Sequence, residues 1–263
     1  MFLLKIPIRP LFLLISAVAL FLAPLSGAAS AETPSEKAAR ILRAVDDMWR
    51  GESSRANITM KVETQNYRRS MRMEAWSKGR DFSLVRILFP LKEKGVATLK
   101  AGNEVYTYLP QTDRTIRLTS GMMMGSWMGS HFTNDDLVKE SRLLEDYEAA
   151  ITFDGARNGR NETDFSLIPK PTAAVVWGKI EMTVAEGLIP VVETYYDEDM
   201  KVSRTMTFKD VRVFGGRRLP ALLRMTPADK PGEYTEIFYE SLKFGLGLDD
   251  SFFSINSLKR ESR

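Results

Sequence analysis

Few residues in this sequence could carry out chemistry. The 263 residues include one histidine, His131, and no cysteine. A histidine-based triad, a cysteine nucleophile or a zinc site with several histidine ligands therefore lacks its residues. His131 could be a loop residue or a general base, and we favour the loop residue.

Acidic residues provide the other candidates for acid-base chemistry. The pairs Asp135-Asp136 and Asp249-Asp250 fit helix starts and turns, where the helix dipole stabilises a carboxylate. The run Asp197-Glu198-Asp199 lacks the spacing of a calcium loop and predicts a turn. We therefore expect no enzymatic activity, no metal site and no cofactor.

A cluster of apolar side chains between Gly121 and Gly129 is the most unusual feature of the sequence. Its members are Met122, Met123, Met124, Trp127 and Met128. Methionine is flexible and suits surfaces that accept varied apolar partners, and the intervening glycines allow backbone freedom. One interpretation is a mobile flap at the rim of an apolar cavity that moves when cargo enters, and the other is an ordinary buried loop.

An amphipathic helix is predicted to begin at Thr33. Thr33 is the N-cap candidate, Pro34 follows it, and Glu36 occupies the capping-box position. Apolar residues then recur at helical spacing, and Gly51 ends the pattern. We expect the face of Ile41, Leu42 and Val45 to cover the inner side of a sheet.

The rest of the chain alternates with a period of two, which is typical of strands. Strand-like segments include 82–89, 95–100, 104–109 and 114–118, separated by turn residues. A second helix is predicted from Thr133, with Asp136 as its capping-box partner, to about Leu144. Short strands joined by tight turns pair antiparallel, so the chain is expected to form one curved antiparallel sheet or open barrel.

Several strand residues could point at the concave face of such a sheet and bind an apolar ligand. These candidates are Met60, Met71, Met73, Trp76, Phe82 and Tyr106. Plain core packing is the alternative for each of them.

The N-terminal 31 residues predict a cleavable signal peptide. Lys5 and Arg9 precede an apolar run from Leu11 to Ala23, and Ala29-Ser30-Ala31 supplies small residues for cleavage after Ala31. The run is shorter than the roughly 20 residues of a membrane-spanning helix. The net charge is +3, of which Lys5 and Arg9 supply two, and no basic segment indicates a nucleic-acid partner. We expect a periplasmic protein in which residues 32–263 form the working domain.

The mature sequence resembles the LolA-like family of periplasmic outer-membrane lipoprotein-sorting proteins, in its broad, larger branch. The resemblance is carried by residues 125–137, Asp146-Tyr147, Leu188-Ile189-Pro190, residues 215–220 and residues 250–254. It implies a half-open antiparallel β-barrel, mainly β, with the N-terminal helix and a short middle helix covering its concave face.

The function implied by this resemblance is that of a carrier, or chaperone. Such a protein would bind acyl chains of a lipid or lipoprotein in an apolar cavity and move them between the inner and outer membranes. Its expected partners are those acyl chains, an inner-membrane transporter and an outer-membrane acceptor. The alternative is a non-enzymatic periplasmic adaptor whose concave face binds a protein partner such as a membrane transporter.

Overall fold

The computed structural model describes residues 32–139, 142–157 and 159–259. The predicted signal peptide lies outside these residues. Thr33–Arg263 is the larger of two compact units of the chain. None of the helices in the described ranges is long and apolar enough to cross a membrane.

The N-terminal helix forms as its capping residues predict. Helix α1 (Pro34–Asp46) begins after Thr33, whose hydroxyl accepts a hydrogen bond from the Glu36 amide while the Glu36 side chain accepts one from the Thr33 amide. Both groups of the capping box are therefore satisfied. The helix ends at Asp46, and a turn continues the chain to Gly51, which has a positive φ of 57°.

In the part of the chain that the structure describes, thirteen strands form one antiparallel sheet that does not close. The first six are β1 (Ser53–Glu63), β2 (Arg68–Lys78), β3 (Phe82–Phe89), β4 (Ala97–Ala101), β5 (Glu104–Leu109) and β6 (Arg114–Arg117). The other seven are β7 (Tyr147–Arg157), β8 (Arg160–Pro169), β9 (Lys179–Ala185), β10 (Ile189–Tyr196), β11 (Val202–Phe214), β12 (Arg217–Pro227) and β13 (Tyr234–Phe244). The expected half-open antiparallel architecture is thereby confirmed.

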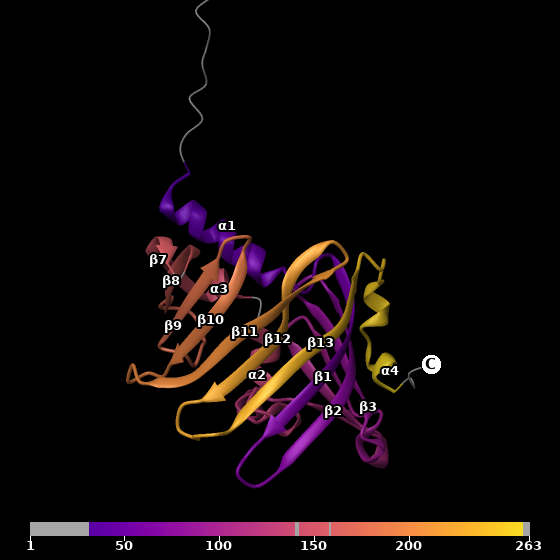
Figure 1. Ribbon diagram of the computed structural model, residues 1–263. Helices are drawn as coiled ribbons and strands as arrows, with labels where there is room; N and C mark the ends of the chain where they lie inside the picture. Colours follow the sequence, from indigo (N-terminus) through magenta and orange to yellow (C-terminus); the bar gives the residue numbers. More distant parts are fainter. Residues whose placement is uncertain (1–31, 140–141, 158, 260–263) are drawn as a thin grey trace, which may run out of the picture. The chain divides into compact units, whose positions relative to one another are not determined.

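The first and last strands of the chain lie next to each other in the middle of the sheet. The order is β6-β5-β4-β3-β2-β1-β13-β12-β11-β10-β9-β8-β7, so each half is a meander and β1 pairs with β13 at the seam. Figure 1 shows the sheet strongly curved, with β7–β10 on the left, β1–β3 on the right and α2 (Asn134–Lys139) behind β11 and β12.

Short helical segments connect and cover the strands. The middle of the chain holds η3 (Ser120–Met122), η4 (Trp127–Gly129), α2 and α3 (Leu143–Asp146), and further short segments are η1 (Leu91–Glu93), η2 (Pro110–Thr112), η5 (Asp250–Phe252) and α4 (Ile255–Leu258). The Thr133–Asp136 capping box of α2 is present as predicted. The single helix expected to reach Leu144 is instead two helices, α2 and α3.

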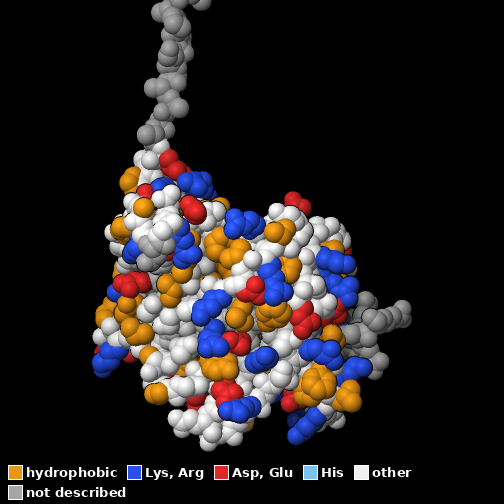
Figure 2. Space-filling model, viewed as in Figure 1, with side chains coloured by type: hydrophobic (Ala, Val, Ile, Leu, Met, Phe, Trp, Pro, Cys, Tyr) orange, Lys and Arg blue, Asp and Glu red, His pale blue; other side chains and the backbone are white. Residues whose placement is uncertain are grey.

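Apolar side chains are buried on both faces of part of the sheet. Residues of α1 pack with β8–β10 around Phe165 and Leu167, and β1–β3 pack with β12 and β13 around Met60 and Met71. On the opposite face of β3 and β4, Leu84 and Leu99 pack beneath Phe253 and Leu258 of the C-terminal segment. Figure 2 shows hydrophobic side chains interspersed with charged ones on the outer surface of β11–β13.

Candidate functional site

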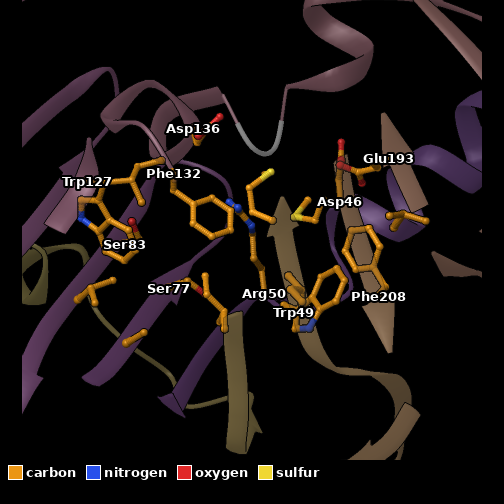
Figure 3. Close-up of a pocket in the computed structure, with 18 of the residues that line it drawn as sticks. Asp46, Trp49, Arg50, Ser77, Ser83, Trp127, Phe132, Asp136, Glu193 and Phe208 are labelled. Atoms are coloured by element: carbon orange, nitrogen blue, oxygen red, sulfur yellow. The ribbon is translucent and has the colours of Figure 1, made fainter. Parts of the chain in front are cut away.

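The concave side of the sheet holds a cavity with mainly apolar walls. Its volume is about 240 Å³, somewhat below the roughly 300–1,000 Å³ typical of ligand sites. The lining comes from the end of α1, from β1–β3, from residues 127–137, Leu143 and Tyr147, from residues 175–180 and from β10–β13. Figure 3 shows Trp127 and Phe132 on one side of this cavity and Trp49 and Phe208 on the other.

Small side chains in register explain why space remains between the sheet and its cover. Ala75 of β2 lies opposite Ala56 of β1 and opposite Val85 of β3. All three line the cavity. A row of short side chains across three neighbouring strands leaves volume that larger residues would fill.

Trp127 covers one side of the cavity and is firmly held there. Its side chain is buried, and its indole NH donates to Thr98 Oγ1 at 3.2 Å. The Trp127 amide donates to the Phe132 carbonyl at 2.8 Å. Arg69 donates to the Met128 carbonyl at 2.9 Å, and the Tyr67 hydroxyl donates to that of Gly129 at 2.5 Å.

The methionines around Trp127 do not share its position. Met122 and Met124 are exposed, and Met123 and Met128 are half-buried. Trp127 lines the cavity, whereas Met122, Met123, Met124 and Met128 do not. Trp127 is thus the member of this cluster that reaches the cavity lining, next to Met128, which has a positive φ of 51°. Movement of this segment on cargo entry stays a prediction.

The candidate residues of the strands are divided between three environments. Met73 lines the cavity, while Met60 and Met71 lie opposite each other in β1 and β2 and are wholly buried in the core. Phe82 and Tyr106 pack with the cluster around Phe253 on the other face of the sheet, so their expected position at the concave face is wrong. The physical reason is strand alternation, since Ser83 and Val85 of β3 face the cavity and Phe82 and Leu84 face away.

Trp76 borders both faces. It contributes to the cavity lining, yet its ring packs against Phe252 at a centroid distance of 5.7 Å. The guanidinium groups of Arg55 and Arg86 also lie over this ring. Trp76 therefore packs with the cluster around Phe253 as well as lining the cavity.

The face of α1 that was expected to cover the sheet is buried. Ile41 and Leu42 pack in the cluster that includes Phe165, and Val45 both joins this cluster and lines the cavity. The amphipathic pattern therefore positions α1 so that its C-terminal end reaches the cavity wall.

Buried charged residues in the cavity are the features that the sequence interpretation missed. Arg204 of β11 donates to both carboxylate oxygens of Asp136 in α2, at 2.8 and 2.5 Å. Its guanidinium also lies 4.4 and 4.5 Å from the ring centroids of Trp177 and Tyr195, which contact each other edge-to-face. A planar guanidinium suits this combination of a bidentate carboxylate and aromatic rings. Asp136 therefore joins α2 to the sheet as well as capping the helix.

Two carboxyl groups lie together at another part of the lining. Glu193 of β10 accepts a hydrogen bond from the Tyr195 hydroxyl, and it faces Asp46 at the end of α1. Burial raises the pKa of Asp46 to about 8, and the nearby Glu193 and Asp47 carboxylates add to this, while Arg80 and Arg50 oppose it. Burial, with the Glu193 carboxylate, also raises the pKa of Tyr195 well above its ordinary value.

His131 is held as part of a loop rather than presented to the cavity. Its ring contacts Thr235 Oγ1 at 2.8 Å through Nδ1 and the Glu233 carboxylate at 3.0 Å through Nε2. These contacts join the Trp127 loop to the β12–β13 hairpin. Within the described ranges, no group of three histidine or acidic side chains is placed to hold a metal ion.

Comparisons with known proteins identify proteins of the same fold. A family model described as "-like: Uncharacterized protein" matches residues 79–260. A DUF1329 family protein from Desulfovibrio piger ATCC 29098 has a TM-score of 0.76 at 18% identity, with 86% of this chain and 99% of that chain covered. No curated protein matches the sequence.

Two further solved structures carry names that describe a process or a superfamily. A putative outer membrane lipoprotein-sorting protein domain from Vibrio parahaemolyticus has a TM-score of 0.74 at 24% identity, covering 85% of this chain and 97% of its own. A LolA superfamily protein from Nitrosomonas europaea has a TM-score of 0.69 at 20% identity, covering 84% and 98%. At these identities the likeness establishes the fold.

Proposed function

Because this chain belongs to a LolA-like family, we propose that it is a periplasmic carrier for the acyl chains of a lipid or lipoprotein. It moves these chains between the inner and outer membranes without enzymatic chemistry. The observation that carries the proposal is the cavity between the concave side of the sheet and its cover of α1, Trp127 and Phe132. Support also comes from the name of the Vibrio parahaemolyticus relative, a putative outer membrane lipoprotein-sorting protein domain.

The energetics of apolar burial suit this role. Each methylene transferred from water to an apolar wall contributes about 0.8 kcal/mol. A cavity lined by Ile58, Met73 and Phe208 provides such a wall. Acyl binding in a water-soluble carrier therefore requires no covalent step and no cofactor.

Filling the cavity should abolish acyl binding while preserving the fold. We expect Ala75→Trp to weaken binding of dodecanol more than tenfold, because an indole placed above the Ala56–Ala75–Val85 row occupies the space of the alkyl chain. Competition with the neutral fluorescent dye N-phenyl-1-naphthylamine measures the affinity, and thermal unfolding checks the fold.

Val213→Trp is the matched control, because Val213 lies on β11 and is 66% exposed. It introduces the same indole outside the cavity and should leave binding within twofold of the unmodified protein. Unchanged dodecanol binding by a folded Ala75→Trp variant would place the acyl site elsewhere.

Export is a separate part of the proposal. We expect residues 1–31 to be a signal peptide that is cleaved after Ala31, leaving 32–263 as the carrier domain. N-terminal sequencing of the protein from a periplasmic fraction should begin at Glu32. Recovery of the full chain from the membrane fraction would contradict the cleavage.

A further inference from the structure

Asp46 is a buried carboxyl group with an unsatisfied oxygen. It lies at the C-terminal end of α1, lines the cavity and is 8% exposed. Its Oδ2 atom is buried, and no hydrogen-bond donor from the described part of the chain reaches it. Such an oxygen destabilises a fold, so its presence at a cavity wall calls for a donor that comes from outside the chain.

The charged residues around Asp46 indicate which charge the donating group carries. Glu193 and Arg50 line the same cavity and act on Asp46, and Arg204 acts on Glu193. Arg80 also acts on Asp46, but it forms an ion pair with Asp47 at 3.1 Å. Burial is the main cause of the raised pKa of Asp46, and the Glu193 carboxylate adds to it. Figure 3 shows Asp46, Glu193 and Arg50 around the same space.

The whole lining shows the same imbalance. Among the described residues, four acidic and two basic side chains line the cavity, and these are Asp46, Asp135, Asp136, Glu193, Arg50 and Arg204. Arg204 is already paired with both carboxylate oxygens of Asp136 and lies against the rings of Trp177 and Tyr195. Its charge is therefore compensated by Asp136, although its buried Nε atom has no acceptor among the described residues.

We propose that Asp46 and Glu193 form a head-group subsite that accepts hydrogen bonds from the amine of an amphiphile, whose alkyl chain packs along the apolar wall. This inference rests on the proposed function and specifies the chemical class of the cargo. An ammonium group supplies the donor that Asp46 Oδ2 lacks, and its positive charge favours the ionised form of the Asp46 carboxyl group. A hydroxyl head supplies the donor alone, and a carboxylate or phosphate head supplies neither and is repelled by Glu193.

Three ligands of equal chain length test the proposal. In competition with N-phenyl-1-naphthylamine at pH 7.5, the full mature protein should bind dodecylamine most tightly, dodecanol less tightly and laurate most weakly. Asp46→Asn should weaken dodecylamine binding by about tenfold, the loss expected for a hydrogen bond between charged groups. The same substitution should leave laurate binding unchanged or strengthen it. Glu193→Gln should act in the same direction.

Asp47→Asn is the matched control, because Asp47 is the adjacent carboxyl group, is 52% exposed and pairs with Arg80 away from the cavity. It should change the affinity for each ligand by less than twofold. Equal affinity for all three ligands, or tightest binding of laurate, would overturn the amine subsite while leaving the acyl carrier intact. Failure of all three to bind would overturn both proposals. Thermal unfolding of each variant confirms that the comparison is between folded proteins.

Discussion

Replacing Asp136 with asparagine is expected to lower the free energy of unfolding by about 3–5 kcal/mol, the cost of removing one partner from a buried ion pair. The side chains of Arg204 and Asp136 are only 7% and 19% exposed. Without the carboxylate, the Arg204 guanidinium remains buried with an uncompensated charge. The substitution also weakens the cap of α2, because the Asp136 side chain accepts a hydrogen bond from the Thr133 amide.

Urea unfolding at neutral pH measures this loss, and two further variants define its origin. Asp210→Asn removes one partner of the exposed pair between Asp210 and Arg212 and should change the stability by about 1 kcal/mol or less. The double variant Asp136→Leu with Arg204→Met should be more stable than Asp136→Asn, because no buried charge is left unpaired. A loss below about 1 kcal/mol for Asp136→Asn would show that the pair contributes no more than a surface contact.

Asp46→Asn is expected to stabilise the protein increasingly as the pH rises from about 4 to about 8. Burial raises the pKa of Asp46 in the native protein to about 8, whereas an aspartate in the unfolded chain has its ordinary pKa of 3.8. Between these values the native state binds more protons than the unfolded state, so unfolding becomes easier as the pH rises. The slope for this one group is at most about 1.4 kcal/mol per pH unit. An asparagine side chain does not titrate and removes this slope.

Urea unfolding at pH 5, 6.5 and 8 tests the expected difference between the two profiles. The four charged groups that act on Asp46 are Arg80, Arg50, Glu193 and Asp47, and all of them remain in the variant. Asp47→Asn serves as the control and should keep the slope of the unmodified protein. Parallel profiles for Asp46→Asn and the unmodified protein would refute an elevated Asp46 pKa. A variant that gains stability and loses dodecylamine binding would identify Asp46 as a residue retained for function.

Local signals in the sequence predicted the elements of the fold well. The Thr33–Glu36 capping box and the apolar spacing of α1 gave its start and its buried face, and the alternation over 82–89 and 104–109 matched β3 and β5. These features depend on neighbouring residues alone, so they can be read without knowledge of tertiary contacts.

The direction of the aromatic side chains was not predictable in the same way. Phe82 and Tyr106 were assigned to the concave face, but the C-terminal segment around Phe253 covers the other face of β3–β5. A strand that is buried on both faces loses the contrast between its inner and outer residues. The identity of the covering segment is a long-range property that the strand itself does not encode.

The positions of the buried charged residues could have been recognised in the sequence. Asp46 follows Leu42 by four residues and so continues the apolar stripe of α1. Arg204 shares its strand face with Met206 and Phe208, which also line the cavity. A charged residue on an otherwise apolar stripe is costly to bury. Such exceptions mark candidate functional positions even in a single sequence.

The seam between β1 and β13 also determines when the fold can be completed during synthesis. Strand β1 is made first and β13 last, and the core around Met60 draws residues from both ends of the chain, including Leu219 and Leu242. Contacts of such high sequence separation slow folding. Until β13 is available, each half of the sheet has an additional unpaired edge that can pair with other chains. A newly made chain therefore depends on protection from aggregation for the whole time between the appearance of its first strand and its last.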